Sequence, residues 1–508
     1  MQESLLKDET LAHKLISKGS WMYLFALLGL PLGYAIRVII SNDLSVGEVG
    51  IIYGLISLMG LISILSSLGL NQQALVYFLP KYYLEHNKDY VTTIYKTVQY
   101  INIFMTLLVS VCMIFFIEYL GSSYIDYPGI EAILYIFLVF FVFTNLSHPL
   151  KGVYQAFQNV FTLKFSEFIK QSIITLCVAA IFIFSVGSVF LYSVAFVIGN
   201  IVFLLLLYYF YTKKYASEIH VGNFVRERSL FTKLIHFGLH GLIAANAMMI
   251  IHNIDMQMLL ILSDTENAGY YTNYMSLIGI ATLLLTPIIS LLFPIISELY
   301  SKGNTEKLGL LQDFFYKYIL IFTLSVVVLL GVFGEVLGVV LYGQDFLYSG
   351  TLLQYLAVFG IFKVIFAINF AILMGIGHIK KRTNILIGVL ILNIVLNIIL
   401  IPLYGALGAG LATGISWTLM ALASFYYVYQ HLPIHFDWVF YIKNTCIIGV
   451  LGVIYSLFHT DIFVLENTYR YTNLAYLLVL GFVTYLILSL CNLKEIKNIF
   501  RELKRFRK

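Results

Sequence analysis

Apolar runs long enough to cross a lipid bilayer recur along the whole chain, and this pattern limits the possible folds more than any other feature. A membrane-spanning helix needs about 20 consecutive apolar residues, whereas a membrane-spanning strand needs about 10 residues of alternating hydrophobicity. The runs show no such alternation. Only 11% of the residues are charged, compared with about 25% in soluble domains. The sequence therefore predicts an all-α integral membrane protein and excludes a soluble fold.

The runs predict fourteen transmembrane helices joined by short connections. They cover residues 20–41, 48–70, 94–118, 130–149, 168–186, 189–211, 234–262, 268–296, 314–334, 351–374, 384–402, 405–429, 439–458 and 471–491. Residues 1–19 carry both charge signs and lack the apolar core of a cleavable signal peptide, so we expect the first span to remain as a membrane anchor.

Lysine and arginine set the orientation, because they concentrate in the cytoplasmic connections of membrane proteins. With both termini in the cytoplasm, all but three of the 31 Lys and Arg residues fall in inside segments or at the inside ends of the adjoining spans. The exceptions are Arg470 in an outside connection, and Arg37 and Lys363 deeper within spans. Three lysines, Lys151, Lys164 and Lys170, lie between the end of the fourth span and the inside start of the fifth. The net charge of +5 therefore reflects membrane topology, and no nucleic-acid partner is expected.

An internal repeat divides the chain. VGIIYGLISLMG (49–60) and AGYYTNYMSLIG (268–279) align at an offset of 219, which pairs the second span with the eighth. Six spans separate the copies, so both have the same orientation. The repeat predicts two pseudo-symmetric six-helix lobes related by an axis along the membrane normal, followed by two further helices. The expected boundaries are a cytoplasmic segment 1–19, N-lobe 20–211, cytoplasmic linker 212–233, C-lobe 234–430, two helices 431–491 and a basic cytoplasmic tail 492–508.

Motifs for enzymatic chemistry are absent from the sequence. It contains no P-loop, G-x-S-x-G, H-E-x-x-H or dinucleotide-binding fingerprint. Its four cysteines have no C-x-x-C spacing, so they are interpreted as packing residues. We therefore expect no catalytic residue, metal or cofactor, and no enzymatic activity.

Two stretches carry a family resemblance. The first is IRVIISNDLSVGEVGIIYGLISLMGLISILSSLGLNQQALVYFLPKY (36–82), and the second is NILIGVLILNIVLNIILIPLYGALGAGLATGISW (384–417). Both resemble the polysaccharide or oligosaccharide flippase family of the MOP superfamily, which also contains MATE drug exporters and lipid II flippases. The second resembles the late L-N-x-x-L-I-P-x-Y-G-x-x-G-A-x-x-A-T motif of the polysaccharide branch.

The resemblance implies a two-lobed protein with a V-shaped cavity in the cytoplasmic (inner) membrane. It would move an undecaprenyl-diphosphate-linked oligosaccharide to the outer leaflet for cell-surface polysaccharide or O-antigen synthesis. Alternating access would be coupled to a cation, H⁺ or Na⁺. The expected partners are this lipid-linked substrate, membrane lipids and the coupling cation. A monomer is expected, alone or with other polysaccharide-assembly proteins.

Lys363 lies near the middle of an apolar run, where a lysine costs about 2.5–3.5 kcal/mol to insert. As a cavity cation it would bind the diphosphate of the substrate. The structural alternatives are a carboxylate partner or snorkelling to an interface. Arg37, in the outer third of the first span, would either line the cavity or snorkel to the outer headgroups.

His252 and Asp255 are three residues apart, hence neighbours on one helix face. Asp255 would carry the coupling ion, pair with Arg37, or belong to a purely structural pair. Pro31, Pro287 and Pro294 are candidate hinges, because proline removes a helix hydrogen bond. A second polar pair, Asn393 and Asn397, is interpreted as hydrogen bonding between helices.

Two alternatives stay open from the sequence. A MATE-like drug or metabolite exporter would have the same fold with an acidic or apolar cavity. A membrane-embedded polysaccharide polymerase or glycosyltransferase would need a large outside segment, and every predicted outside connection is short.

Overall fold

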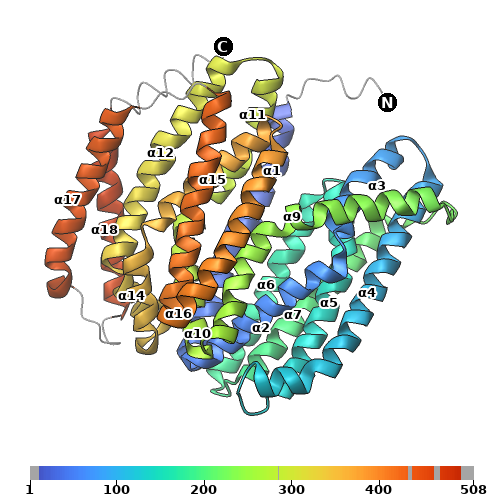
Figure 1. Cartoon of the computed structure of the whole chain (residues 1–508), viewed down its shortest axis with the longest axis horizontal. Helices are drawn as coiled ribbons and strands as arrows, with labels where there is room; N and C mark the ends of the chain where they lie inside the picture. Colours follow the sequence, from blue (N-terminus) through green and yellow to red (C-terminus); the bar gives the residue numbers. More distant parts are fainter. Residues whose placement is uncertain (1–10, 284, 433–436, 463–469, 494–508) are drawn as a thin grey trace. The chain divides into compact units, whose positions relative to one another are not determined.

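The computed structural model describes residues 11–283, 285–432, 437–462 and 470–493. Helices and their connections account for these residues, which contain no strand (Figure 1). The chain divides into two compact units, Met1–Gln257 (unit 1) and Met258–Lys508 (unit 2). The all-α fold predicted from the apolar runs is confirmed. The lobe boundaries expected from the sequence stay a prediction.

Unit 1 contains α1 to α8 and most of α9. Their bounds are α1 Leu11–Asp43, α2 Val46–Ser67, a π-helical turn Leu70–Ala74, α3 Leu75–Leu84, α4 Lys88–Ser123, α5 Ile130–Ala156, α6 Val160–Ile183, α7 Val189–Lys214, α8 Ala216–Ile219 and α9 Arg228–Leu262.

Unit 2 contains the end of α9 and all later helices. Their bounds are α10 Thr265–Leu283, α11 Thr286–Ser301, α12 Thr305–Val332, α13 Gly334–Tyr342, a 3₁₀ turn Gln344–Phe346, α14 Leu347–Leu356, α15 Phe359–Gly375, α16 Ile379–His431, α17 Trp438–Ile462 and α18 Arg470–Cys491.

Nine helices in the described part of the chain are long and apolar enough to cross a membrane. A tenth span results if the bent pair Gln344–Leu356 and Phe359–Gly375 is counted as one. The chain is therefore a multi-pass membrane protein, and the number of fourteen spans stays a prediction.

Helix α16 reverses direction at Gly405. A straight helix of its 53 residues would be about 80 Å long. Yet the rings of His378, just before α16, and His431, at its end, are 4.1 Å apart. Gly405 has φ 54° and ψ −127°, and the next backbone N–H, that of Ala406, donates to Asn267 Oδ1 at 2.9 Å. The two halves of α16 correspond to the predicted spans on either side of the P-L-Y-G turn.

The capped N-termini of α2 and α10 extend the internal repeat. Ser45 precedes α2, and its hydroxyl accepts a hydrogen bond from Glu48 N at 3.4 Å. Asp264 precedes α10, and its carboxylate accepts one from Asn267 N at 2.7 Å. Such caps satisfy backbone N–H groups that have no partner within the helix. Ser45 and Asp264 are 219 residues apart, and so are Glu48 and Asn267, which is the offset of the repeat in the sequence.

The helix that follows each cap is broken partway along. After α2, Leu68 and Gly69 both adopt the left-handed conformation, with φ 45° and 69°. A Cβ atom on Gly69 would lie 2.2 Å from Gly238 O, so this position requires glycine. In unit 2, α10 and α11 form the corresponding broken pair, and Pro287 lies in the first turn of α11.

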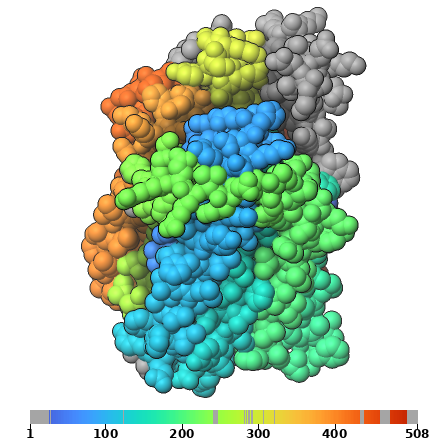
Figure 2. Space-filling model, turned by 90° about the vertical axis from the view of Figure 1, so that its right-hand side faces the viewer, coloured from blue at the N-terminus to red at the C-terminus, as the bar shows by residue number. Residues whose placement is uncertain are grey.

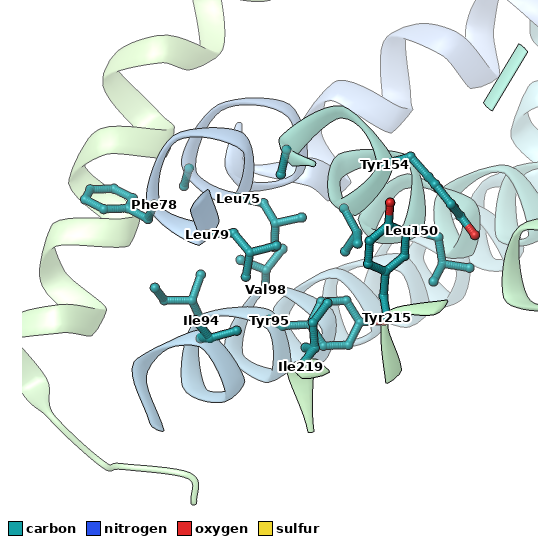
Figure 3. Packing of buried hydrophobic residues seen from close by; sticks show 14 of the residues in the cluster. Leu75, Phe78, Leu79, Ile94, Tyr95, Val98, Leu150, Tyr154, Tyr215 and Ile219 are labelled. Carbon is teal, nitrogen blue, oxygen red and sulfur yellow. The ribbon is translucent and has the colours of Figure 1, made fainter. Parts of the chain in front are cut away.

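Apolar side chains from α3, α4 and α5 form a core in unit 1. Figure 3 shows Leu75 and Leu79 of α3 meeting Ile94 and Val98 of α4, with Leu150 of α5 beside them. All five are at most 5% exposed. This packing fixes the rotation of α4 and α5 and thereby positions the polar residues further along them.

The connection between α7 and α9 lies against the α3–α4 corner, where Figure 2 shows green residues beside blue ones. Thr92 Oγ1 of α4 accepts a hydrogen bond from Gly222 N at 3.1 Å, and Thr93 Oγ1 accepts one from Val225 N at 2.9 Å. Part of the expected linker 212–233 is therefore attached to α4 through its backbone.

Candidate functional site

Lys363 of α15 lies against an aromatic ring. Its Nζ is 4.9 Å from the centre of the Trp417 ring of α16. Its side chain is partly buried, and it belongs to none of the ion pairs found in the described residues. Among the described residues, Lys363 therefore has an aromatic neighbour and no carboxylate partner. Its role as a cavity cation stays a prediction.

Arg37 of α1 has a similar environment within unit 1. Its guanidinium carbon lies 3.8 Å from the centre of the Tyr53 ring of α2. This stacking on an aromatic face suits the planar guanidinium. Cavity lining by Arg37 stays a prediction.

His252 and Asp255 are neighbours on α9 but have different environments. Asp255 is 0% exposed, whereas His252 is exposed. Two residues later, Gln257 Nε2 donates to Gly54 O of α2 at 3.0 Å, so this part of α9 packs closely on α2. Ion coupling by either residue stays a prediction.

The other candidates lie in defined places. Pro31 lies inside α1, Pro294 inside α11 and Pro287 in the first turn of α11. Their role as hinges stays a prediction. Asn397 Nδ2 donates to Asn393 Oδ1 at 3.3 Å, and both residues are fully buried. This hydrogen bond runs along one helix, whereas the sequence suggested bonding between helices.

A cation cluster that the sequence did not predict lies on α5, α6 and α7. Lys151 Nζ of α5 is 4.9 Å from the centre of the Phe203 ring of α7, and Lys170 Nζ of α6 is 5.5 Å from the same ring. Lys170 also donates to Asn200 Oδ1 at 2.8 Å. The amide of Asn200 is held in turn by a bond from its Nδ2 to Phe196 O at 2.9 Å. The ammonium groups of Lys151 and Lys170 therefore both lie close to the Phe203 ring.

The carboxylate within this cluster is already paired. Glu167 forms an ion pair with Lys164 at 2.7 Å. Its charge also acts on Lys151 and Lys170, but neither forms an ion pair with a carboxylate in the described part of the chain. Within the described residues the two ammonium groups therefore have no carboxylate partner, and an anion with two negative charges would suit the pair.

The structure shortens the connection between the fourth and fifth predicted spans to residues 157–159, and it places Lys151 within α5 and Lys164 and Lys170 within α6. The cytoplasmic location of these three lysines stays a prediction. Asn159 caps α6, and its side chain accepts a hydrogen bond from Thr162 N at 3.4 Å. α6 therefore begins at Val160, eight residues before the predicted span 168–186. The spacing of residues 164, 167 and 170 was the available signal, because it places them on one helix face.

Comparisons with known proteins agree on one family and one fold. The family model for polysaccharide biosynthesis proteins matches residues 15–300, more than half of the chain. An uncharacterized membrane protein of Methanocaldococcus jannaschii is 23% identical over 515 aligned residues, covering 97% of this chain and 99% of that protein.

Two solved structures show the fold. The lipid II flippase MurJ, in an inward closed conformation, matches 95% of this chain and 100% of its own, with TM-score 0.69 and 15% identity. An inward-facing multidrug resistance MATE family transporter of the MOP superfamily matches 80% of this chain and 97% of its own, with TM-score 0.66 and 14% identity. At these identities the likeness concerns the fold alone.

Proposed function

Because the chain belongs to the polysaccharide biosynthesis protein family and has a MOP-superfamily fold, we propose that it is a flippase for lipid-linked oligosaccharide. It moves a polyprenyl-diphosphate-linked oligosaccharide from the inner to the outer leaflet of the cytoplasmic membrane, with both termini in the cytoplasm. The family description supports a role in polysaccharide synthesis, and the fold supports transport.

The Lys151–Lys170 cluster is the observation that carries the substrate assignment. A diphosphate linkage carries about two negative charges, and charge-assisted hydrogen bonds to phosphate oxygens are stronger than neutral ones. Lys170 is oriented by Asn200, and both ammonium groups lie beside the Phe203 ring. This preorganised pair binds the diphosphate, while the sugar remains in water and the polyprenyl chain remains in lipid.

Transport follows from alternating access. Lys151 and Lys170 hold the headgroup while the protein changes between its inward-open and outward-open states. Entry of the coupling ion, H⁺ or Na⁺, down its gradient drives the cycle. The polyprenyl chain never leaves the bilayer, so the site needs to recognise only the diphosphate and the adjoining sugar.

The test is transport by Lys170→Ala, Lys170→Arg and Lys213→Ala in proteoliposomes containing a tagged lipid-linked oligosaccharide. Lys213 is the matched control, because it is an exposed lysine at the end of α7, with its Nζ 5.5 Å from the centre of the Tyr209 ring. Lys170→Ala should lower the flipping rate roughly ten-fold, as expected for losing about 1.4 kcal/mol of interaction. Lys170→Arg should keep part of the activity, and the control should match wild type.

Wild-type activity in Lys170→Ala would remove the cluster from the mechanism. Transport of a cationic dye without movement of the lipid-linked substrate would identify a MATE-like exporter instead.

A further inference from the structure

Asn200 of α7 connects the three helices that carry the cation cluster. Its Oδ1 accepts a hydrogen bond from Lys170 Nζ of α6 at 2.8 Å and another from Thr144 Oγ1 of α5 at 3.3 Å. Its Nδ2 donates to Phe196 O of α7 at 2.9 Å. Asn200 is 2% exposed. One buried amide therefore links α5, α6 and α7 at the position of the lysines.

Close packing of α7 on α6 holds Asn200 in place. A Cβ on Gly199 would lie 2.3 Å from Ile174 Cγ1 of α6, so even an alanine here would have to displace Ile174. Ile174 lies four residues after Lys170, on the same face of α6. Phe203 lies three residues after Asn200, on the same face of α7. The amide, the ammonium group and the ring therefore meet at one helix contact.

The amide of Asn200 presents a neutral acceptor to Lys170. An ammonium group can only donate hydrogen bonds, so the amide oxygen faces Lys170 and the NH₂ group faces the backbone. This bond orients the ammonium group as a carboxylate would, but it adds no negative charge. Lys151 Nζ lies 4.9 Å from the centre of the Phe203 ring, and Lys170 Nζ lies 5.5 Å from it. An anion that binds both lysines therefore meets two ammonium groups, one of them already oriented.

We propose that Asn200 is a positioning residue that gives this site its preference for a diphosphate over a monophosphate linkage. This role rests on the proposed flippase function, because it concerns the headgroup of that substrate. A sugar joined to lipid through a diphosphate carries about two negative charges, and one joined through a single phosphate carries about one. With a neutral acceptor at position 200, both lysines keep their charge for phosphate oxygens. A carboxylate there would pair with Lys170 and leave one cation, which suits a monophosphate.

The test measures binding of two probes to the full-length protein in detergent by isothermal titration calorimetry. The probes are farnesyl-diphosphate-linked N-acetylglucosamine and its farnesyl-monophosphate-linked counterpart. Wild type should bind the diphosphate probe roughly ten-fold or more tightly than the monophosphate probe. Asn200→Asp should lower the diphosphate affinity by a similar factor and change the monophosphate affinity little, so the preference disappears.

Asn444→Asp is the matched control for this change. Asn444 lies in unit 2 and is 1% exposed, and its Nδ2 also donates to a backbone carbonyl, that of Phe440, at 2.8 Å. This variant introduces the same carboxylate into a buried helical position outside the cluster. It should keep the wild-type preference for the diphosphate probe.

A double-mutant cycle separates positioning from packing and remains available if Asn200→Asp does not fold. Asn200→Ala should weaken diphosphate binding when Lys170 is present and have little further effect in the Lys170→Ala variant, because Asn200 acts through Lys170. Asn200→Ser retains an acceptor oxygen and should keep part of the affinity. Additive effects of Asn200→Ala and Lys170→Ala would assign a packing role to Asn200 and overturn the proposal.

An unchanged diphosphate preference in folded Asn200→Asp would also overturn it, as would a folded wild-type protein that binds neither probe. Transport of lipid-linked substrate by a wild-type protein without this preference would reject the role of Asn200 and leave the flippase function standing. A preference that depends on Asn200, in a protein that moves no lipid-linked substrate, would support the positioning role and reject the flippase function.

Discussion

At the scale of single residues, the cations within spans are stabilised by aromatic rings. Arg37 lies over Tyr53, and Lys363 lies over Trp417. A desolvated cation–π contact contributes about 2 kcal/mol, whereas a lysine at the centre of a span costs about 2.5–3.5 kcal/mol. The ring therefore offsets most of the cost of Lys363, and the proposed role requires that its charge is available to an anion.

Replacing Lys363 tests this availability. Lys363→Ala should reduce surface polysaccharide, or flipping in proteoliposomes, roughly ten-fold at normal protein levels, because the anion loses a charged partner. Lys363→Arg should retain part of the activity, since the charge remains. Lys302→Ala should have no effect, because Lys302 is an exposed lysine paired with Glu298. Full activity of Lys363→Ala would show that this lysine has only a packing role.

Replacing Asp255 separates a structural role from ion coupling. We expect Asp255→Asn to lower the unfolding temperature, because the carboxylate is 0% exposed in a part of α9 that packs on α2. Leu239→Ala is the control on the same helix and should unfold like wild type, since Leu239 is 49% exposed. Loss of gradient-driven transport with unchanged stability and substrate binding would contradict this expectation and assign coupling to Asp255.

At the scale of elements, the arrangement of side chains depends on where the backbone leaves helical geometry. The break after α2 and the reversal of α16 both occur at residues with positive φ, Gly69 and Gly405. The first leads into the π-helical turn Leu70–Ala74, and the second returns the chain so that His378 and His431 meet. Local backbone geometry therefore determines which side chains become neighbours.

Substitution at the α2 break should be strongly destabilising. Gly69→Ala places a Cβ 2.2 Å from Gly238 O and forces a left-handed conformation on alanine, so the unfolding temperature should fall by several degrees. Gly388→Ala in α16 is the matched control. Nothing lies within 4 Å of its Cβ position, and alanine favours the helix by about 1 kcal/mol, so stability should be equal or higher. Equal effects of the two substitutions would refute the tight contact.

The ends of α16 should make stability depend on pH. Burial, the neighbouring His431 ring and the charge of Lys381 lower the pKa of His378 below its usual value. The unfolded state then binds more protons, so stability should be complete above about pH 6.5 and decline as the pH falls below it. His378→Asn should flatten unfolding temperatures measured between pH 7.5 and 5.5. An unchanged decline in this variant would assign the effect to other groups.

At the scale of the whole molecule, charge distribution and repetition describe the same topology. All but three Lys and Arg residues occupy predicted inside segments or the inside ends of the adjoining spans, and matching caps at Ser45 and Asp264 begin corresponding broken helices. Two units of similar construction are typical of secondary transporters built from internal repeats.

Reporter fusions test this topology. Fusions after residues 230 and 382 should report a cytoplasmic location, because basic segments surround them, and a fusion near 345 should report an external one. Expression of each fusion is checked with an antibody, so that a missing signal is not read as a location. A cytoplasmic signal at 345 would refute the predicted orientation.

The sequence by itself determined the membrane class, the family and the main reversals of the chain. Water-free hydrocarbon requires helices that satisfy their own backbone groups, so apolar runs and glycine-containing turns such as that at Gly405 are readable without a structure. Only the tertiary structure decided which side chains meet. Helices that are apolar all round carry little periodic signal for the face they bury. The convergence of Lys151 and Lys170 on Phe203 therefore depended on how α5 to α7 pack.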